Sequence, residues 1–174
     1  MNKITRNVVA CLIGLSIISC TKVPITGRKQ LKLLPDSMMA EMGQTNYAAF
    51  LKENPAVSPP TRQSAEVTAV GLRISKAVEK YMKDNNLSQK IAGYKWEFNV
   101  VDSKEVNAWC MPGGKVVVYT GILPLTKDDA GLAVVMGHEI AHAIADHGNE
   151  RMSQELAVQA AGIGLQVFMQ TKPQ

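Results

Sequence analysis

The three histidines of the chain all lie in the stretch GHEIAHAIADHG, residues 137–148. His138, Glu139 and His142 form the pattern HExxH. Four residues advance 400° around a helix, so the two histidines lie about 40° apart on one face, one turn from each other. Both imidazoles can then reach a single zinc ion at about 2.0–2.1 Å. Glu139 is placed to accept a proton from metal-bound water without being a ligand.

A catalytic zinc site needs a third protein ligand, and the nearby candidates are poorly placed for that role. On an unbroken helix His147 lies 140° around from His142, which favours a position in the last turn, near the helix C-terminus. Asp146 is either an acceptor that orients the ring of His142 or a solvated carboxylate. Glu150 and Glu155 open the next predicted helix, and either would need a tight reversal to reach the metal.

The elements around this motif predict an α+β fold. The HExxH helix is expected to begin at Thr126 as N-cap, with Asp129 at the capping-box position. Two helices and two strands precede it, and a long apolar helix follows it. Helices before strands, without a βαβ alternation, indicate a mostly helical domain with a small β-sheet. The predicted ranges are 38–53, capped by Asp36 or Ser37, and 62–83 for the first helices, 94–102 and 115–123 for the strands, and 149–169 for the last helix.

The N-terminus has the composition of a bacterial export signal. Lys3 and Arg6 precede an apolar run from Val8 to Ser19, which as a helix rises only about 18 Å and is too short to span a bilayer core. The stretch IISC resembles a lipobox, so we expect Cys20 to carry the lipid and to become the first mature residue. The alternative is an ordinary secretory signal in which Cys20 is incidental.

Composition excludes several other classes of protein. With 46% hydrophobic and 20% charged residues, the 174-residue chain is globular and large enough for one domain with its own core. Of 19 basic residues, two lie in the signal, which leaves 17 against 15 acidic ones, with no basic run that favours nucleic acid. Cys11 leaves with the signal and Cys20 is lipidated, so no disulfide can form within the mature chain. Cys110 is either a metal or redox group or a small buried hydrophobic side chain.

Two segments, NAWCMPGGKVVVYTGIL and GHEIAHAIADHGNERMSQ, resemble the exported zinc endopeptidases related to the CaaX prenyl proteases and the mitochondrial Oma-type proteases. The resemblance runs from about Asp36 to the chain end. It implies a zincin-like (gluzincin) domain that binds one zinc ion through His138 and His142, with Glu139 as general base. It also implies that substrate pairs, as an added strand, with an edge strand; the implied residues are Val116, Val117, Val118 and Tyr119. Asn107 either binds substrate or fixes a turn.

In the family that the chain resembles, the third ligand is a glutamate on a helix beyond the apolar helix that follows HExxH. The sequence contains no such acidic helix before Gln174. We therefore expect the ligand beyond this residue, and little or no protease activity from the 174-residue chain itself. The alternative is that the protein has lost the ligand.

Together these observations predict a lipoprotein signal at 1–19, a tether at 20–35 and a metallopeptidase domain at 36–174 that lacks its C-terminal part. The expected function is that of a zinc-dependent endopeptidase of the bacterial cell envelope, which hydrolyses misfolded envelope proteins with metal-activated water. The alternative is a non-catalytic lipoprotein that binds unfolded or partner polypeptides through an edge strand. Thr21 is not an acidic retention signal, which favours the periplasmic face of the outer membrane over the inner membrane.

Overall fold

The computed structural model describes residues 20–170 except Pro24 and Pro59, and of Cys20 and residues 167–170 only the backbone. The predicted signal peptide lies outside the described residues. The chain divides into two compact units, Asp36–Gly148 and Met1–Pro35 together with Asn149–Gln174. The predicted domain 36–174 is thus divided at residue 148. None of the helices in the described ranges is long and apolar enough to cross a bilayer.

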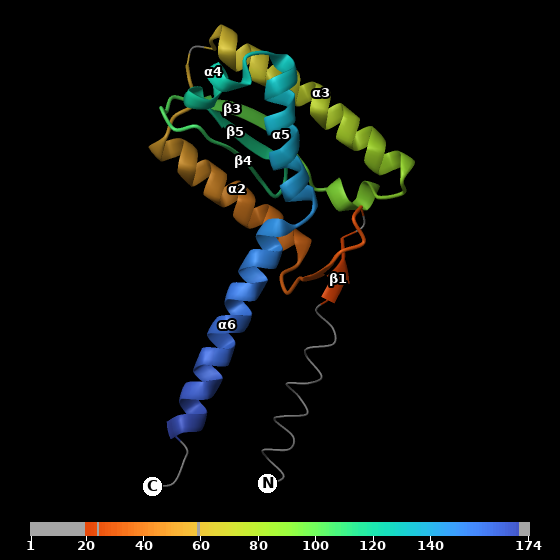
Figure 1. Ribbon diagram of the computed structural model, residues 1–174, viewed down its shortest axis with the longest axis vertical. Coiled ribbons are helices and arrows are strands. Elements are labelled where there is room, and N and C mark those ends of the chain that lie inside the picture. Colours follow the sequence, from red (N-terminus) through yellow and green to blue (C-terminus); the bar gives the residue numbers. More distant parts are fainter. Residues whose placement is uncertain (1–19, 24, 59, 171–174) are drawn as a thin grey trace. The chain divides into compact units, whose positions relative to one another are not determined.

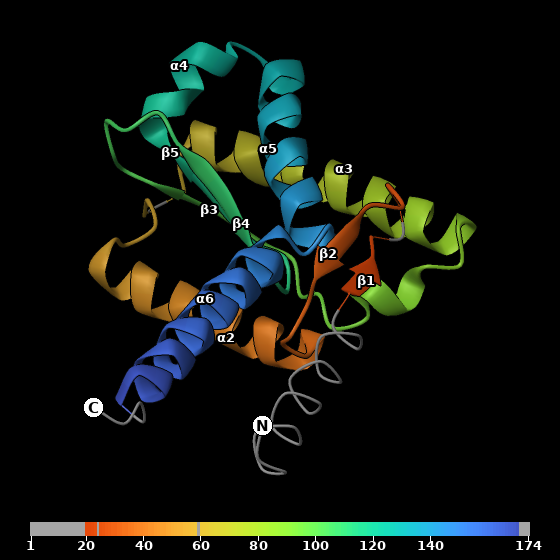
Figure 2. The same cartoon turned by 60° about the horizontal axis from the view of Figure 1, so that its bottom comes forward.

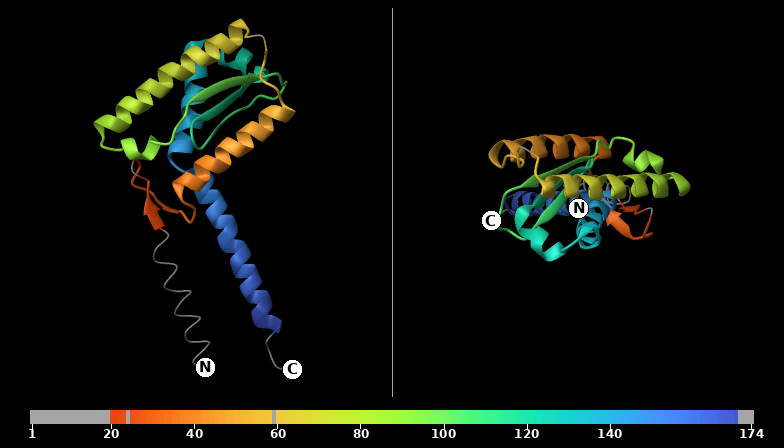
Figure 3. Two further views of the ribbon diagram at one scale, coloured as in Figure 1. Left: turned by 180° about the vertical axis from the view of Figure 1, so that it is seen from behind. Right: turned by 90° about the horizontal axis from the view of Figure 1, so that it is seen from above.

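In the unit Asp36–Gly148, helices cover both faces of a three-stranded sheet (Figure 1). The strand order is β3-β5-β4, with β5 parallel to β3 and antiparallel to β4. Helix α2 lies on one face, and helices α3 and α5 lie on the other (Figure 3). The predicted α+β class is therefore confirmed. The bounds are α2 Asp36–Glu53, α3 Arg62–Asp84, η1 Ser88–Ile91, β3 Glu97–Val101, β4 Ala108–Met111, β5 Lys115–Tyr119, η2 Thr120–Ile122, α4 Leu123–Thr126 and α5 Asp129–Ile144.

The central strand β5 is buried on both faces, which explains its unbroken run of valines. Val116 and Val118 pack with α3 and α5, whereas Val117 packs with Tyr47 on the α2 side. All three valines are 0% exposed. Side chains of β3 add to the α3 and α5 side with the predicted period of two: Phe98 and Val100 both join that core.

The helix that carries HExxH begins later than the sequence predicts. Thr126 is the last residue of α4, and its hydroxyl donates to the carbonyl of Leu123 at 2.9 Å. Lys127 then adopts a positive φ of 64°, which separates α4 from α5. Asp128 is the actual N-cap, because its carboxylate accepts from the backbone N–H of Gly131 at 2.8 Å.

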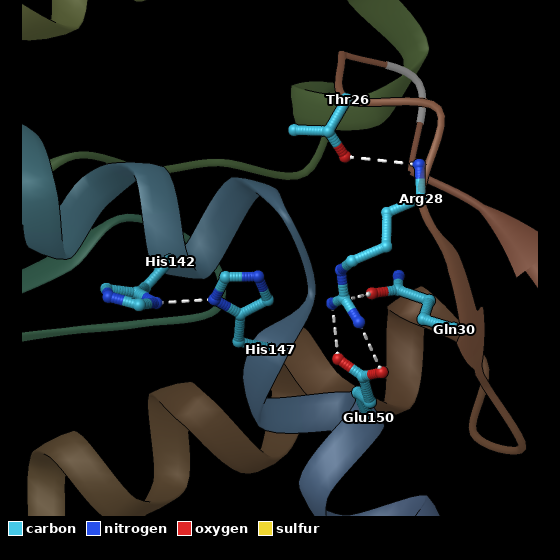
Figure 4. Close-up of polar contacts among 6 residues, drawn as sticks. All are labelled: Thr26, Arg28, Gln30, His142, His147 and Glu150. Atoms are coloured by element: carbon cyan, nitrogen blue, oxygen red, sulfur yellow. Dashed lines mark hydrogen bonds and ion pairs between the residues drawn. The ribbon is translucent and has the colours of Figure 1, made fainter.

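In the other unit, residues predicted to be a tether form an antiparallel hairpin of β1 (Cys20–Lys22) and β2 (Lys29–Leu31) (Figure 2). The hairpin is bonded to α6 (His147–Gln170). The Arg28 guanidinium donates to both carboxylate oxygens of Glu150, at 2.8 and 2.5 Å (Figure 4). Ser153 accepts from the backbone N–H of Leu33 at 2.9 Å. Residues 20–35 therefore contain a hairpin that is bonded to α6.

Lys115, at the start of β5, is a buried cation with an exposed partner. Its side chain is 2% exposed, and it forms an ion pair with Glu97, whose side chain is 47% exposed. Its ammonium also donates to the carbonyl of Lys95 at 2.7 Å and lies 6.0 Å from the ring centroid of Tyr47. Burial raises the pKa of the Tyr47 hydroxyl, so this side of the sheet encloses two polar groups with few water contacts.

This asymmetry predicts unequal effects for the two partners. Replacing Glu97 with alanine leaves the ammonium buried without its counter-charge, and we expect a loss of about 2–3 kcal/mol in the free energy of unfolding. Lys115→Met leaves a half-exposed carboxylate that water can solvate, and its cost should stay within about 1 kcal/mol. Urea unfolding measures both variants, with the exposed Glu105→Ala as control. A larger loss for Lys115→Met than for Glu97→Ala would contradict this account.

Candidate metal centre

Burial of one side of α5 sets the direction of the HExxH side chains. Leu132, Met136 and Ile140 recur at helical spacing, are at most 1% exposed, and pack in the core between α3, α5 and the sheet. His138 and His142 lie on the exposed side of α5. The apolar stripe therefore turns both imidazoles outward, as the HExxH spacing predicts.

The two imidazoles converge through their Nε2 atoms, which lie 2.9 Å apart. Their ring centroids are 4.4 Å apart, and the planes are nearly perpendicular at 85°. Two imidazole ligands of a tetrahedral zinc ion hold their nitrogens about 3.3 Å apart. The observed 2.9 Å lies within a few tenths of an ångström of this value, so the two nitrogens fit two ligand positions of a zinc site. Within the part of the chain that the structure describes, no group of three or more His, Cys, Asp or Glu side chains could hold a metal.

Glu139 is partly buried and lies on the side of α5 that faces β4. Burial is the main cause that raises the pKa of the Cys110 thiol on β4 to about 12, and the negative charge of Glu139 is the second cause. Cys110 is therefore a protonated thiol at neutral pH, which agrees with a small buried side chain rather than with a metal ligand or a reactive thiolate.

The prediction that His147 points away from His142 is wrong, because the helix is not continuous. Asp146 adopts a positive φ of 59°, which ends α5 and lets α6 begin at His147. Because of this break, the side chain of His147 points toward His142, and Nδ1 of His147 contacts Nδ1 of His142 (Figure 4). The ring centroids are 4.7 Å apart.

Two of the three other nearby carboxylates form ion pairs elsewhere. Asp146 forms an ion pair with Lys90 of η1, and both side chains are at most 15% exposed, so the prediction of a solvated carboxylate is wrong. Glu150 pairs with Arg28 in the other compact unit, and Glu155 is exposed.

The predicted edge strand is the centre of the sheet. Val116, Val117, Val118 and Tyr119 belong to β5, which pairs with β3 on one side and with β4 on the other. Its backbone therefore cannot accept a further strand, and the expectation that β5 is an edge is wrong. Periodicity identifies a buried strand but not its neighbours in the sheet.

Among the described residues, β4 forms the free edge of the sheet, and this strand was not predicted from the sequence (Figure 1). Asn107 accepts from the backbone N–H of Tyr119 at 3.1 Å, and antiparallel pairing alternates, so the N–H and C=O groups of Ala108 and Cys110 point away from β5. The opposite edge of the sheet is partly occupied, because Val57 donates to the carbonyl of Val100 at 2.8 Å.

A turn signal could have revealed β4. Gly113 and Gly114 have positive φ values of 90° and 83° and connect β4 to β5. A Pro-Gly-Gly stretch between two apolar runs is typical of a hairpin. Asn107 is exposed and immediately precedes β4, at the end of the strand opposite the Gly113–Gly114 turn.

Comparisons with known proteins agree with the motif. Residues 70–172, more than half of the chain, match peptidase family M48. The mitochondrial metalloendopeptidase OMA1 of Arabidopsis thaliana is 42% identical over 83 residues, which are 48% of this chain and 17% of that protein. The OMA1 protein of Bos taurus is 35% identical over 132 residues, 75% of this chain and 24% of its own length.

A bacterial relative is matched over a larger share of its length. Metalloprotease YcaL of Escherichia coli K12 is 28% identical over 150 residues, which are 83% of this chain and 58% of YcaL. The chain thus spans less than two thirds of each of these relatives. The family match covers α5 and its HExxH motif as well as all three strands of the sheet. The chain belongs to peptidase family M48.

Proposed function

We propose that the protein is a zinc-dependent endopeptidase in which His138 and His142 hold the metal and Glu139 is the general base. The convergence of the two Nε2 atoms, 2.9 Å apart on the exposed side of α5, carries this proposal. Membership of family M48 and relatives named metalloendopeptidases support it.

Zinc bound at this position supplies Lewis-acid activation of water and of the substrate carbonyl. The chain supplies the proton transfer and the positioning. Glu139 is adjacent to His138 on α5, so its carboxylate can reach a water molecule at the proposed metal position. It accepts the proton that the attacking water loses and can deliver it to the leaving amine nitrogen.

We further propose that substrate binds as an extended strand along β4 rather than β5. The outward N–H and C=O groups of Ala108 and Cys110 can pair with any extended backbone, whatever its sequence. Helix α5 packs against β4, so a strand added at this edge passes beside HExxH. The exposed Asn107 can donate to the same peptide. Such recognition suits unfolded or misfolded polypeptides.

The expected location and substrates remain part of this proposal. A basic start, an apolar run and the IISC stretch indicate export and lipidation at Cys20, which is also the first residue of β1. We infer that the protein acts in the cell envelope on misfolded envelope proteins, with the outer membrane favoured over the inner membrane by Thr21.

Zinc content and cleavage separate the proposed roles of the three motif residues. We expect His138→Ala and His142→Ala to lose zinc, because each removes one of the two converging nitrogens. Glu139→Gln should retain zinc and lower cleavage of unfolded casein by about 10²–10⁴-fold, the usual contribution of a general base. Elemental analysis after dialysis gives the zinc content, and Glu155→Gln serves as the matched exposed control.

Zinc content is the first measurement, because it does not depend on the rate of cleavage. Full zinc retention by His138→Ala would contradict the assignment of ligands. Casein binding with zinc content unaffected by any of the three changes would favour the non-catalytic alternative.

Strand addition at β4 predicts an alternating effect of N-methylation along a peptide substrate. Methyl groups at positions whose N–H faces β4 remove one hydrogen bond each, and should weaken binding to the Glu139→Gln variant by roughly 3- to 10-fold. Methyl groups at the intervening positions face away and are the matched controls. Fluorescence anisotropy of a labelled peptide series measures the affinities. Equal losses at both sets of positions would exclude pairing with this edge.

A further inference from the structure

The two ring nitrogens of His142 face different partners. Its Nε2 lies 2.9 Å from Nε2 of His138, on the side where the metal is proposed to bind. Its Nδ1 contacts Nδ1 of His147. We propose that His147 is a positioning residue: it accepts a hydrogen bond from Nδ1–H of His142 and thereby aims Nε2 of His142 at the zinc ion. This inference rests on the proposed function.

Proton accounting gives the direction of this hydrogen bond. A neutral imidazole carries one N–H and one lone pair. A zinc ligand offers its lone pair to the metal, so a His142 that binds through Nε2 carries its proton on Nδ1. The facing nitrogen of His147 must then supply a lone pair, which places the proton of His147 on its Nε2. One arrangement of protons therefore satisfies the metal, His142 and the contact together.

The backbone around His147 is arranged to make this contact. Helix α5 ends at Ile144, and Asp146, two residues later, has a positive φ that prevents the helix from continuing. His147 is the first residue of α6. The ion pair between Asp146 and Lys90 of η1 buries the carboxylate at this turn, and so stabilises the break. The ring planes of His142 and His147 are inclined by 62°. A ring held in this way loses less conformational entropy when its other nitrogen binds metal.

Partners of this kind fix the orientation of ligating histidines in metal sites, and their removal typically lowers metal affinity 10–100-fold. We therefore expect His147→Ala to weaken zinc binding by 10–100-fold, as measured by chelator competition. The Oδ1 atom of asparagine can occupy nearly the same position as Nδ1 of histidine, so His147→Asn should recover most of the affinity. Gln154→Ala, an exposed change on the same helix, is the control.

Two further readouts separate positioning from a general structural effect. In the zinc-free state, His147→Ala and His147→Asn should have similar midpoints of thermal unfolding, although their zinc affinities differ. Long-range ¹H–¹⁵N spectra of the zinc-loaded protein should show the proton of His142 on Nδ1 and that of His147 on Nε2. These spectra report on proton positions and do not depend on activity.

Several outcomes would overturn the inference. Equal zinc affinity of His147→Ala and the unaltered chain would exclude a positioning role, while leaving the proposed function intact. A metal-bound ¹⁵N shift for a nitrogen of His147 would make this residue a ligand instead. Absence of zinc binding by the unaltered chain, or binding that His138→Ala does not weaken, would overturn the proposed function and this inference with it.

Discussion

The burial of the apolar stripe of α5 against the sheet is the interaction on which the candidate site depends. Leu132, Met136 and Ile140 are almost completely buried, and each such side chain contributes about 1.5–3 kcal/mol when it leaves water. This burial stabilises the fold and also sets the rotation of the helix about its axis. His138 and His142 lie at positions i and i+4 on the opposite side of α5. The packing of the apolar stripe therefore directs both imidazoles outward.

The surface that receives this stripe is itself a consequence of β5. A strand buried on both faces needs apolar side chains in consecutive positions, and Val116, Val117 and Val118 provide them. With β5 in the centre, β4 lies at the edge on the side of α5 and leaves the outward groups of Ala108 and Cys110 for another strand. The packing around β5 thus places both the helix that carries the candidate metal centre and the free edge of β4 beside it.

The interruption of the helix at Asp146 brings His147 against the candidate metal centre. On a continuous helix His147 would project away from His142, and His142 would lack this neighbour. A single residue in the left-handed region costs about 1–2 kcal/mol, and burial of its ion pair with Lys90 holds it in place. Backbone strain near functional groups is common where it improves their orientation, and the His142–His147 contact is the gain visible here.

Features that depend on short-range periodicity could be predicted from the sequence. HExxH spacing placed His138 and His142 on one helical face. The apolar repeats marked α2 and α3, and the alternation of β3 marked its buried side. Only the tertiary structure decided which strand is the edge, because strand order depends on pairing between distant segments. It also decided where His147 points, since the break at Asp146 is stabilised by Lys90, which lies 56 residues earlier in the chain. A local sequence pattern does not predict such a contact. Lysine and aspartate are usually surface residues, and only the fold shows which two of them pair.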